Sequence, residues 1–202
     1  MITVVDYRAG NLASVQKALR HLGYESQVTD NPEVVRRSPR IILPGVGHFS
    51  STQRIADLGV NDAIREVVAR GVPFLGICVG MQWLYEGSTE APDVTGLGTF
   101  AGMVERFPDD PAHKVPHVGW NQLTRVPGTE SRLLRDIPDG SFVYYTHSYR
   151  GPVVPGVVAT TNYAGDFAAV VERDNVFGVQ FHPEKSGETG LKMLRNFCEV
   201  NA

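Results

Sequence analysis

The segment Gly76–Gln82, which reads GICVGMQ, constrains the fold of this chain more than any other. An apolar run from residue 72 to residue 77 leads directly into Cys78, and glycines lie two positions before and two positions after the cysteine. This order predicts a buried strand, a sharp turn and a helix, which is the G-x-nucleophile-x-G pattern of a nucleophile elbow. The thiol of Cys78 would then stand clear at the carboxyl edge of a sheet. The alternative is a small buried hydrophobic side chain, which is what most free cysteines are.

Strands and helices alternate in the first half of the sequence. Residues Ile2–Val5 and Arg40–Leu43 form β-branched and apolar runs, and Gln27-Val28 forms a weaker one. Asn11 can cap a helix whose apolar residues recur at helical spacing, and residues 60–69 predict another helix. Short apolar strands separated by amphipathic helices are typical of a parallel sheet that is covered on both faces. We therefore expect a flavodoxin-like α/β fold with a mostly parallel central sheet flanked by helices.

The second half of the sequence is richer in glycine and β-branched residues. The helix after Cys78 is expected to continue through Trp83 and Tyr85, with β-rich runs following at 96–107 and 115–123. A closing helix is expected around residues 191–197, after four more strand candidates: Phe142–Tyr145, Val157–Thr161, Ala168–Glu172 and Val176–Phe181. The last two are joined across a short turn as in a hairpin, which predicts additional antiparallel strands in this half.

The composition is that of an ordinary soluble protein, with 42% hydrophobic and 20% charged residues, and we expect one domain spanning residues 1–202. A net charge of −3 without a dense Lys/Arg run gives no electrostatic reason to expect nucleic acid or a membrane as partner. The amino-terminal residues lack the pattern of a signal peptide, and no apolar run approaches the ~20 residues that span a bilayer. Cys78 and Cys198 form no disulfide framework, so we expect free thiols and a cytoplasmic location.

A cysteine nucleophile needs a base and a group that orients the base. His182 ends the apolar run 176–181 and is followed by Pro183 and Glu184. Residues two apart in an extended segment point the same way, so Glu184 could orient His182 toward the thiol, as in a Cys-His-acid triad. The other histidines lie in turns, at strand ends or at the polar end of a helix, where bonds to backbone, a partner surface or solvent are expected: His21, His48, His113, His117 and His147.

An acyl-transfer site also needs an oxyanion hole. In Pro44-Gly45-Val46-Gly47 the two glycines would let the backbone at Val46 and Gly47 turn an N–H toward a substrate. The N–H of Val79, at the start of the helix after the elbow, would be a second donor. The G-x-G here lacks the further glycine and acid of a dinucleotide site, and no P-loop pattern occurs. We therefore expect no cofactor, and the two cysteines are not at metal-ligand spacing.

Three blocks of the sequence resemble the signature blocks of the class I (triad) glutamine amidotransferases: PGVGHF at 44–49, GICVGMQ at 76–82 and GVQFHPEKS at 178–186. Further segments resemble the glutaminase subunits of imidazole glycerol phosphate synthase, an enzyme of histidine biosynthesis: DYRAGNLASVQKAL at 6–19, KVPHVGWNQL at 114–123 and YYTHSY at 144–149. The resemblance runs essentially from end to end. It departs at Arg8, because the opening of those subunits usually reads D-Y-G, and a glycine there would permit φ > 0.

The resemblance implies an enzyme that hydrolyses glutamine to glutamate and ammonia. Cys78 would attack the side-chain amide of glutamine, His182 would protonate the departing ammonia and then activate water, and Glu184 would orient His182. The backbone N–H groups of Val46 and Val79 would stabilise the oxyanion. By the same resemblance, the substrate would be held by Gln82, Glu90 and the backbone around His147, Ser148 and Tyr149.

The resemblance also implies a partner protein. Released ammonia would enter a cyclase subunit with a (β/α)8 barrel, which forms imidazole glycerol phosphate, and the two subunits would make a heterodimer. Lys185 and the segment 116–121, with Pro116, Trp120 and Asn121, would face that partner. A backbone rearrangement at residues 45–47 would couple glutaminase activity to occupancy of the partner.

Three alternatives stay open on the residues alone. A glutaminase subunit of another synthase, such as anthranilate, aminodeoxychorismate or pyridoxal phosphate synthase, would not account for the segment 115–121. A non-catalytic regulatory subunit of the same fold would not need Cys78, His182 and Glu184 together. A cysteine peptidase or redox sensor on a similar scaffold would keep an elbow cysteine but gives no reason for Gln82 or for the H-P-E triplet.

Overall fold

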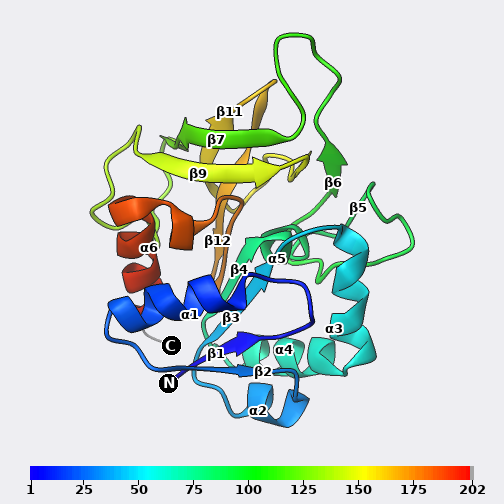
Figure 1. Ribbon diagram of the computed structural model, residues 1–202, viewed down its shortest axis with the longest axis vertical. Helices are drawn as coiled ribbons and strands as arrows, with labels where there is room; N and C mark the ends of the chain where they lie inside the picture. Colours follow the sequence, from blue (N-terminus) through cyan, green and yellow to red (C-terminus); the bar gives the residue numbers. More distant parts are fainter. Residues whose placement is uncertain (201–202) are drawn as a thin grey trace.

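A computed structural model describes residues 1–200, and a sheet of eight strands lies at its centre, in the order β2-β1-β3-β4-β13-β12-β11-β8 (Figure 1). From β2 to β13 neighbouring strands are parallel, and from β13 to β8 they are antiparallel. This arrangement confirms the expected α/β class. In the order of the sheet the strands are β2 Ser26–Thr29, β1 Ile2–Val5, β3 Ile41–Gly45, β4 Phe74–Cys78, β13 Val176–Val179, β12 Asp166–Arg173, β11 Val157–Asn162 and β8 Thr124–Arg125.

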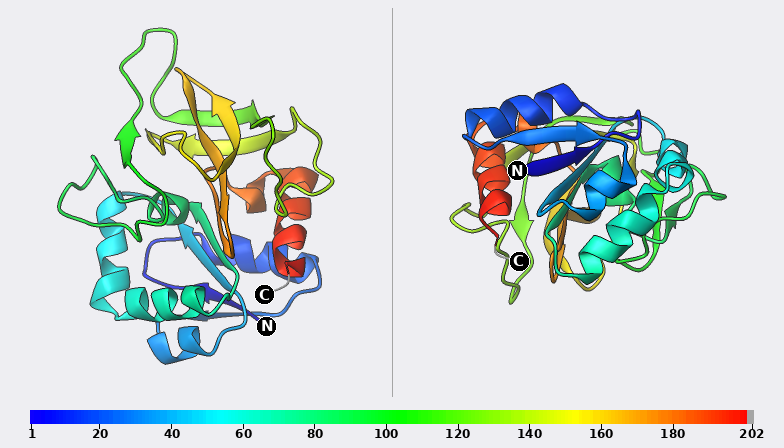
Figure 2. Two further views of the ribbon diagram at one scale, coloured as in Figure 1. Left: turned by 180° about the vertical axis from the view of Figure 1, so that it is seen from behind. Right: turned by 90° about the horizontal axis from the view of Figure 1, so that it is seen from below.

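Helices cover both faces of the parallel part, with α1 on one face and α4 on the other (Figures 1 and 2). Asn11 caps α1 as expected, because its side chain accepts a hydrogen bond from the N–H of Ser14. The helices are α1 Leu12–His21, α2 Pro32–Arg36, η1 Phe49–Thr52, α3 Gln53–Asp57, α4 Val60–Ala69, α5 Val79–Gln82, η2 Pro183–Lys185 and α6 Gly187–Glu199. Within residues 1–200, no helix is both long and apolar enough to cross a membrane.

Two small sheets lie over the carboxyl ends of the parallel strands. One joins β10 (Tyr149–Arg150), β6 (Met103–Arg106) and β5 (Gly87–Ser88), and the other joins β7 (His117–Gln122) to β9 (Phe142–His147) in antiparallel pairing. The β7–β9 pair lies across β11 and β12, as the front view and the view from behind show (Figures 1 and 2). It is tied to β11 by a bond of 2.6 Å between the hydroxyls of Tyr145 and Thr161.

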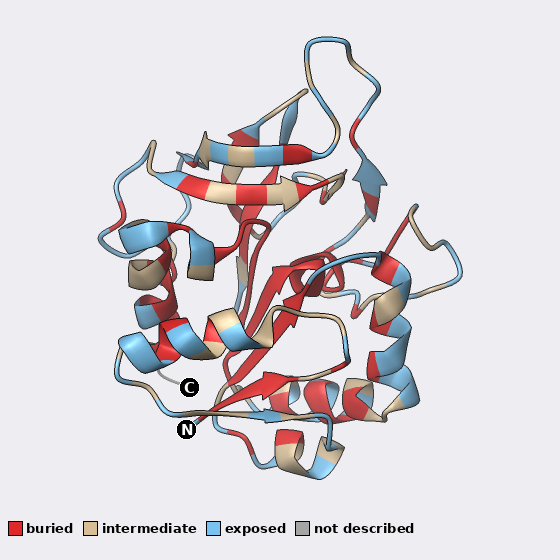
Figure 3. Cartoon of the chain, in the orientation of Figure 1, coloured by how far each residue is buried: buried red, intermediate tan, exposed pale blue. Residues whose placement is uncertain are grey.

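The core is built from the parallel strands, whose residues are buried throughout β1, β3, β4 and β13 (Figure 3). Continuous apolar runs are expected for strands that have helices on both faces. The β7–β9 pair differs, because its side chains alternate between a buried face and an open one. The carboxyl ends of β3, β4 and β13 therefore meet beneath a second, partly open layer.

Two expectations from the sequence are wrong in this region. The helix after Cys78 ends at Gln82 and does not continue through Tyr85. Segment 97–100 takes over the carbonyls that a longer helix would use, since the N–H groups of Leu97 and Phe100 bond to the carbonyls of Trp83 and Leu84. That segment is consequently a loop, and only Met103–Arg106 of the expected β-rich run 96–107 forms a strand.

Candidate active site

The strand, turn and helix expected around Cys78 are present as β4 and α5. Cys78 has φ 55° and ψ −111°, a strained conformation for a residue with a side chain. The flanking glycines allow β3, β4 and α5 to approach closely. A Cβ at Gly76 would lie 2.4 Å from the carbonyl oxygen of Gly80, and one at Gly80 would lie 2.0 Å from that of Leu43. The two glycines are therefore required by packing as well as by the turn.

The structure brings His182 and Glu184 together in the segment that follows β13. His182 Nδ1 lies 3.0 Å from Glu184 Oε1, and the two side chains are 2% and 1% exposed. The segment is not extended as expected but forms the 3-10 turn η2, closed by a bond from the N–H of Lys185 to the carbonyl of His182. Ser186 also stabilises this turn, because its hydroxyl donates a hydrogen bond to the same carbonyl of His182. The pair is thus held rigidly and away from water.

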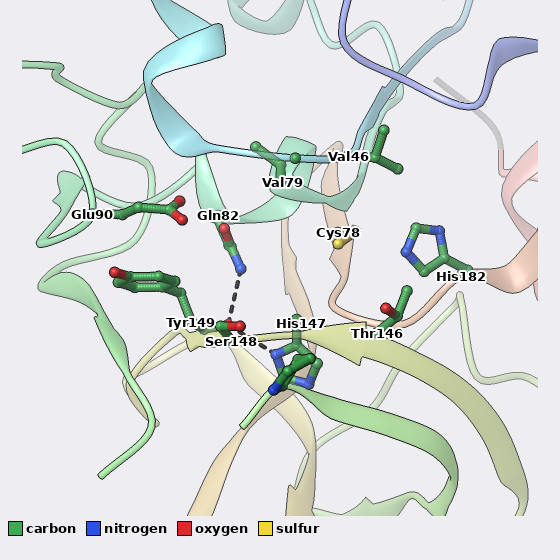
Figure 4. A pocket seen from close by; sticks show the side chains of 12 residues that line it. Val46, Cys78, Val79, Gln82, Glu90, Thr146, His147, Ser148, Tyr149 and His182 are labelled. Carbon is green, nitrogen blue, oxygen red and sulfur yellow. Dashed lines mark hydrogen bonds between the residues drawn. The ribbon is translucent and has the colours of Figure 1, made fainter. Parts of the chain in front are cut away.

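The imidazole of His182 has one nitrogen toward Glu184 and the other free. Among the described residues no group bonds to Nε2 of His182, and Figure 4 shows a ring nitrogen on the side that faces the sulfur of Cys78. Burial acts to lower the pKa of His182, but its contacts with Cys78 and Glu184 outweigh burial and raise the pKa to about 10. This environment favours the protonated form of the His182 imidazole beside the sulfur of Cys78.

A pocket of about 250 Å³ opens in front of the Cys78 sulfur (Figure 4). It contains every residue that the sequence predicted for the oxyanion hole and for substrate contacts, together with two that were not expected there, Pro116 and Thr146. Its lining is Val46, Gly47, Cys78, Val79, Gln82, Glu90, Pro116, Thr146, His147, Ser148, Tyr149 and His182. The chain therefore offers one pocket that has a thiol, an imidazole and several polar groups in its wall.

Two polar side chains in the pocket are held by backbone groups. Glu90 Oε2 accepts a bond of 2.7 Å from the N–H of Phe49, so the carboxylate of this loop residue is fixed rather than freely solvated. Gln82 is 3% exposed, and its Nε2 donates to the carbonyl of Tyr149 at 3.0 Å. Both side chains are oriented before any ligand arrives.

His117 and His147 form a buried pair, in which His147 lines the pocket, and sequence reasoning missed this pairing. Nδ1 of His117 lies 3.0 Å from Nε2 of His147, and Nδ1 of His147 lies 2.8 Å from the carbonyl oxygen of Tyr149. Burial lowers the pKa of His117 to about 4 and that of His147 to about 3. Side chains alternate between two faces along the strands 117–122 and 142–147, which puts both histidines on the face opposite Trp120. This alternation could have revealed the pairing from the sequence.

The residues expected at a partner surface do not all lie on the same face of the structure. Lys185 is exposed, and so is Trp120, with 55% of its surface open. Asn121 points to the other face of β7, where its amide donates to the carbonyl of Asn162 at 3.1 Å. Asn121 is partly exposed, so its expected place at a partner surface stays a prediction.

Comparison with known proteins places this arrangement in a family. A profile of the family described as "Glutamine amidotransferase class-I" matches residues 3–200. The chain belongs to this amidotransferase family. It is 48% identical over 204 residues to "Imidazole glycerol phosphate synthase subunit HisH" of Moorella thermoacetica, covering 98% of this chain and 94% of that protein.

Two further matches concern a longer protein and a solved structure. "Imidazole glycerol phosphate synthase hisHF" of Emericella nidulans is 40% identical over 209 residues, which cover 98% of this chain and 38% of that protein. A solved amidotransferase, "Crystal structure of glutamine amidotransferase", has a TM-score of 0.76 at 20% identity and covers 98% of both chains. At that identity the structural match shows the fold alone.

Proposed function

We propose that this chain is the glutaminase subunit of an imidazole glycerol phosphate synthase, with Cys78, His182 and Glu184 as its catalytic triad. The observation that carries the proposal is the alignment of an elbow thiol, a buried imidazole and a buried carboxylate at one pocket of about 250 Å³. Amidotransferase membership and relatives named as subunits of that synthase supply the reaction and the pathway.

The first half-reaction forms a thioester. The Cys78 thiolate attacks the carboxamide carbon of glutamine, so that a C–S bond forms and the carbonyl oxygen becomes an oxyanion. Backbone N–H groups at Val46 and Val79, which both line the pocket, stabilise that oxyanion. His182 then gives its proton to the amide nitrogen, the C–N bond breaks and ammonia leaves.

The second half-reaction releases glutamate. His182, now neutral, takes a proton from a water molecule that attacks the thioester carbonyl, and the C–S bond breaks with its electron pair returning to sulfur. Glu184 keeps the imidazole in the tautomer that has its Nε2 free for both transfers, and it stabilises the imidazolium that results. No cofactor is required by this sequence of steps.

Polar groups at the far end of the pocket hold the amino-acid part of glutamine. The carboxylate of Glu90 suits the α-ammonium group, because burial in a pocket strengthens an ion pair that also has hydrogen bonds. Gln82 and the backbone at His147, Ser148 and Tyr149 complete the cradle. A smaller amine that lacks the α-carboxylate of glutamine would leave some of these polar groups without a partner. Such an amine would therefore bind more weakly than glutamine.

The open face of the β7–β9 pair is the surface for a partner. Val118, Trp120 and Phe142 are each more than half exposed there, with 57%, 55% and 52% of their surfaces open, and an apolar patch of this kind is typical of an interface. The backbone of Tyr144 in β9 bonds in both directions to the triad turn, to the N–H of His182 and the hydroxyl of Ser186. A partner on this face would therefore act directly on the His182 segment.

The partner that fits is a cyclase subunit with a (β/α)8 barrel, which would receive the ammonia in a heterodimer. Support comes from the fused relative, in which the matching region is 38% of a longer chain named hisHF. Lys185 and Pro116 lie near the rim of this surface, and they are proposed contacts. One domain over residues 1–202 and a cytoplasmic location, consistent with two free cysteines, complete the proposal.

Ammonia release from glutamine tests the function. The purified chain should release ammonia slowly alone and faster when the cyclase subunit and its nucleotide ligand are added, and Cys78→Ala should abolish release in both conditions. The Cys78→Ala complex should still make product when free ammonia replaces glutamine, because the cyclase site is intact. Loss of the ammonia-dependent reaction as well would assign Cys78 a structural role, and no stimulated release from the unaltered chain would refute the proposal.

A further inference from the structure

Gln180 occupies a position that none of the steps above uses, although it lies beside the nucleophile. Strands β13 and β4 pair in parallel with Val179 opposite Ile77, so the next residue of each, Gln180 and Cys78, leave the sheet side by side. Gln180 has no exposed surface, and its Nε2 lies 3.7 Å from Cys78 Sγ. A buried amide in such a place must satisfy its hydrogen-bonding groups with its neighbours.

The direction of the hydrogen bonds at Gln180 follows from a backbone carbonyl. The oxygen of Tyr149 can only accept, so the end of the Gln82 side chain that lies 3.0 Å from it must be the NH2 group. The same NH2 group lies 3.2 Å from the side chain of Gln180 and must donate there too, which makes the contacting atom of Gln180 its oxygen. The NH2 group of Gln180 is then the end that faces the sulfur.

We propose that Gln180 donates an N–H to the sulfur of Cys78 and holds it as a thiolate independently of His182. This inference rests on the proposed glutaminase function and names a further residue of the same site. The two donors act at different moments. When the thioester hydrolyses, His182 is taking a proton from water and cannot assist the sulfur, whereas Gln180 can donate to the electron pair that returns to sulfur as the C–S bond breaks.

The hydrogen bonds of the side-chain amides of Gln82 and Gln180 also leave one atom of Gln82 for the substrate. Because both N–H bonds of Gln82 are used within the protein, to Tyr149 and Gln180, its Oε1 is the atom that remains for a donor of glutamine. The tautomers of the histidine pair agree with this direction. His147 must carry its proton on Nδ1 to bond to the same carbonyl of Tyr149, and His117 then donates to Nε2 of His147.

Alkylation of Cys78 by iodoacetamide measures the thiolate without any turnover of glutamine. In Gln180→Leu, which removes the N–H at similar size, the pH profile of alkylation should move up by about one pH unit, since a hydrogen bond to a charged group is worth at least one such unit. With the cyclase present, kcat/KM for glutamine should fall about tenfold. Cys78→Ala gives the background from the buried Cys198.

Gln27→Leu is the matched control, because Gln27 is a partly buried amide with one side-chain bond, to Thr3 at 3.1 Å, at the far edge of the sheet. Its alkylation profile and kcat/KM should equal those of the unaltered chain. The proposal would be overturned by a folded Gln180→Leu protein whose alkylation profile is not shifted in pH and whose kcat/KM stays within twofold of that of the unaltered chain. If that variant does not fold, side-chain amide resonances of the 15N-glutamine-labelled unaltered chain decide it.

One glutamine NH2 resonance should titrate with the same pH profile as alkylation, and this titration should vanish in Cys78→Ala. Absence of any such resonance refutes the proposal. The outcome is separate from that for the proposed function, because neither alkylation nor the resonance requires glutamine. If the pH profile of alkylation depends on Gln180 but the cyclase does not stimulate ammonia release, the glutaminase function is refuted and this inference still holds.

Discussion

Acidification should destabilise this protein through the buried pair His117 and His147. The two side chains belong to residues that are only 4% and 6% exposed, and His117 is stacked between the rings of Tyr145 and Tyr163 at centroid distances of 4.9 and 4.0 Å. Nε2 of His147 accepts the N–H of His117, so a second proton on His147 would meet a donor. The folded protein therefore holds both imidazoles neutral, whereas the unfolded chain charges them near the ordinary pKa.

The magnitude follows from the pKa of His117, which burial lowers from 6.5 to about 4. Between these two pH values the unfolded chain binds more protons than the folded protein, so the free energy of unfolding decreases as the pH falls. At 1.36 kcal/mol per unit, this histidine alone lowers that free energy by about 2 kcal/mol between about pH 7 and about pH 5. The loss reaches about 3 kcal/mol once the pH is below the folded pKa.

Urea unfolding followed by tryptophan fluorescence, at several pH values from about 7 to about 5, measures this effect. His117→Asn keeps a donor near His147 but removes the titrating ring, so its stability should be lower at neutral pH and should decline less steeply on acidification. His21→Asn, at an exposed position of α1, is the control and should keep the steep decline. Equal slopes for His117→Asn and the unaltered chain would refute the argument.

Three further predictions concern backbone, strain and partner. Gly80→Ala should destabilise the fold by about 2 kcal/mol or more in urea unfolding, because its Cβ would lie 2.0 Å from the Leu43 carbonyl; unchanged stability would contradict the packing at the elbow. Arg8 has φ 64°, a conformation that glycine adopts without strain. Arg8→Gly should therefore be at least as stable as the unaltered chain, and Arg8→Val should be about 1 kcal/mol less stable than Arg8→Gly. The reverse order of stability would exclude strain at this position. Trp120→Ala should weaken cyclase binding about 30-fold in calorimetry, while Val28→Ala, in β2 at the far edge of the eight-stranded sheet, should leave the affinity unchanged. Equal affinities for Trp120→Ala and the unaltered chain would place the interface elsewhere.

Local sequence signals predicted the parts of the fold that depend on near neighbours. The apolar run before Cys78 and its two glycines specified the elbow, because a strand, a tight turn and a close approach each leave a mark on a few adjacent residues. Capping by Asn11 and the helix at residues 60–69 were found for the same reason. The extent of the helix after the elbow was not, since it is ended by bonds from a segment more than ten residues away.

The sequence by itself determined the class of the fold, the elbow that carries Cys78 and the H-P-E triplet, because each is written in a contiguous pattern of residue types. Only the tertiary structure decided how these parts act together. The register of β13 against β4 places Gln180 beside Cys78, and the crossing of β7 and β9 over the sheet buries His117 against His147. Pairings between distant strands fix such contacts, and no local periodicity records which distant residue lies opposite.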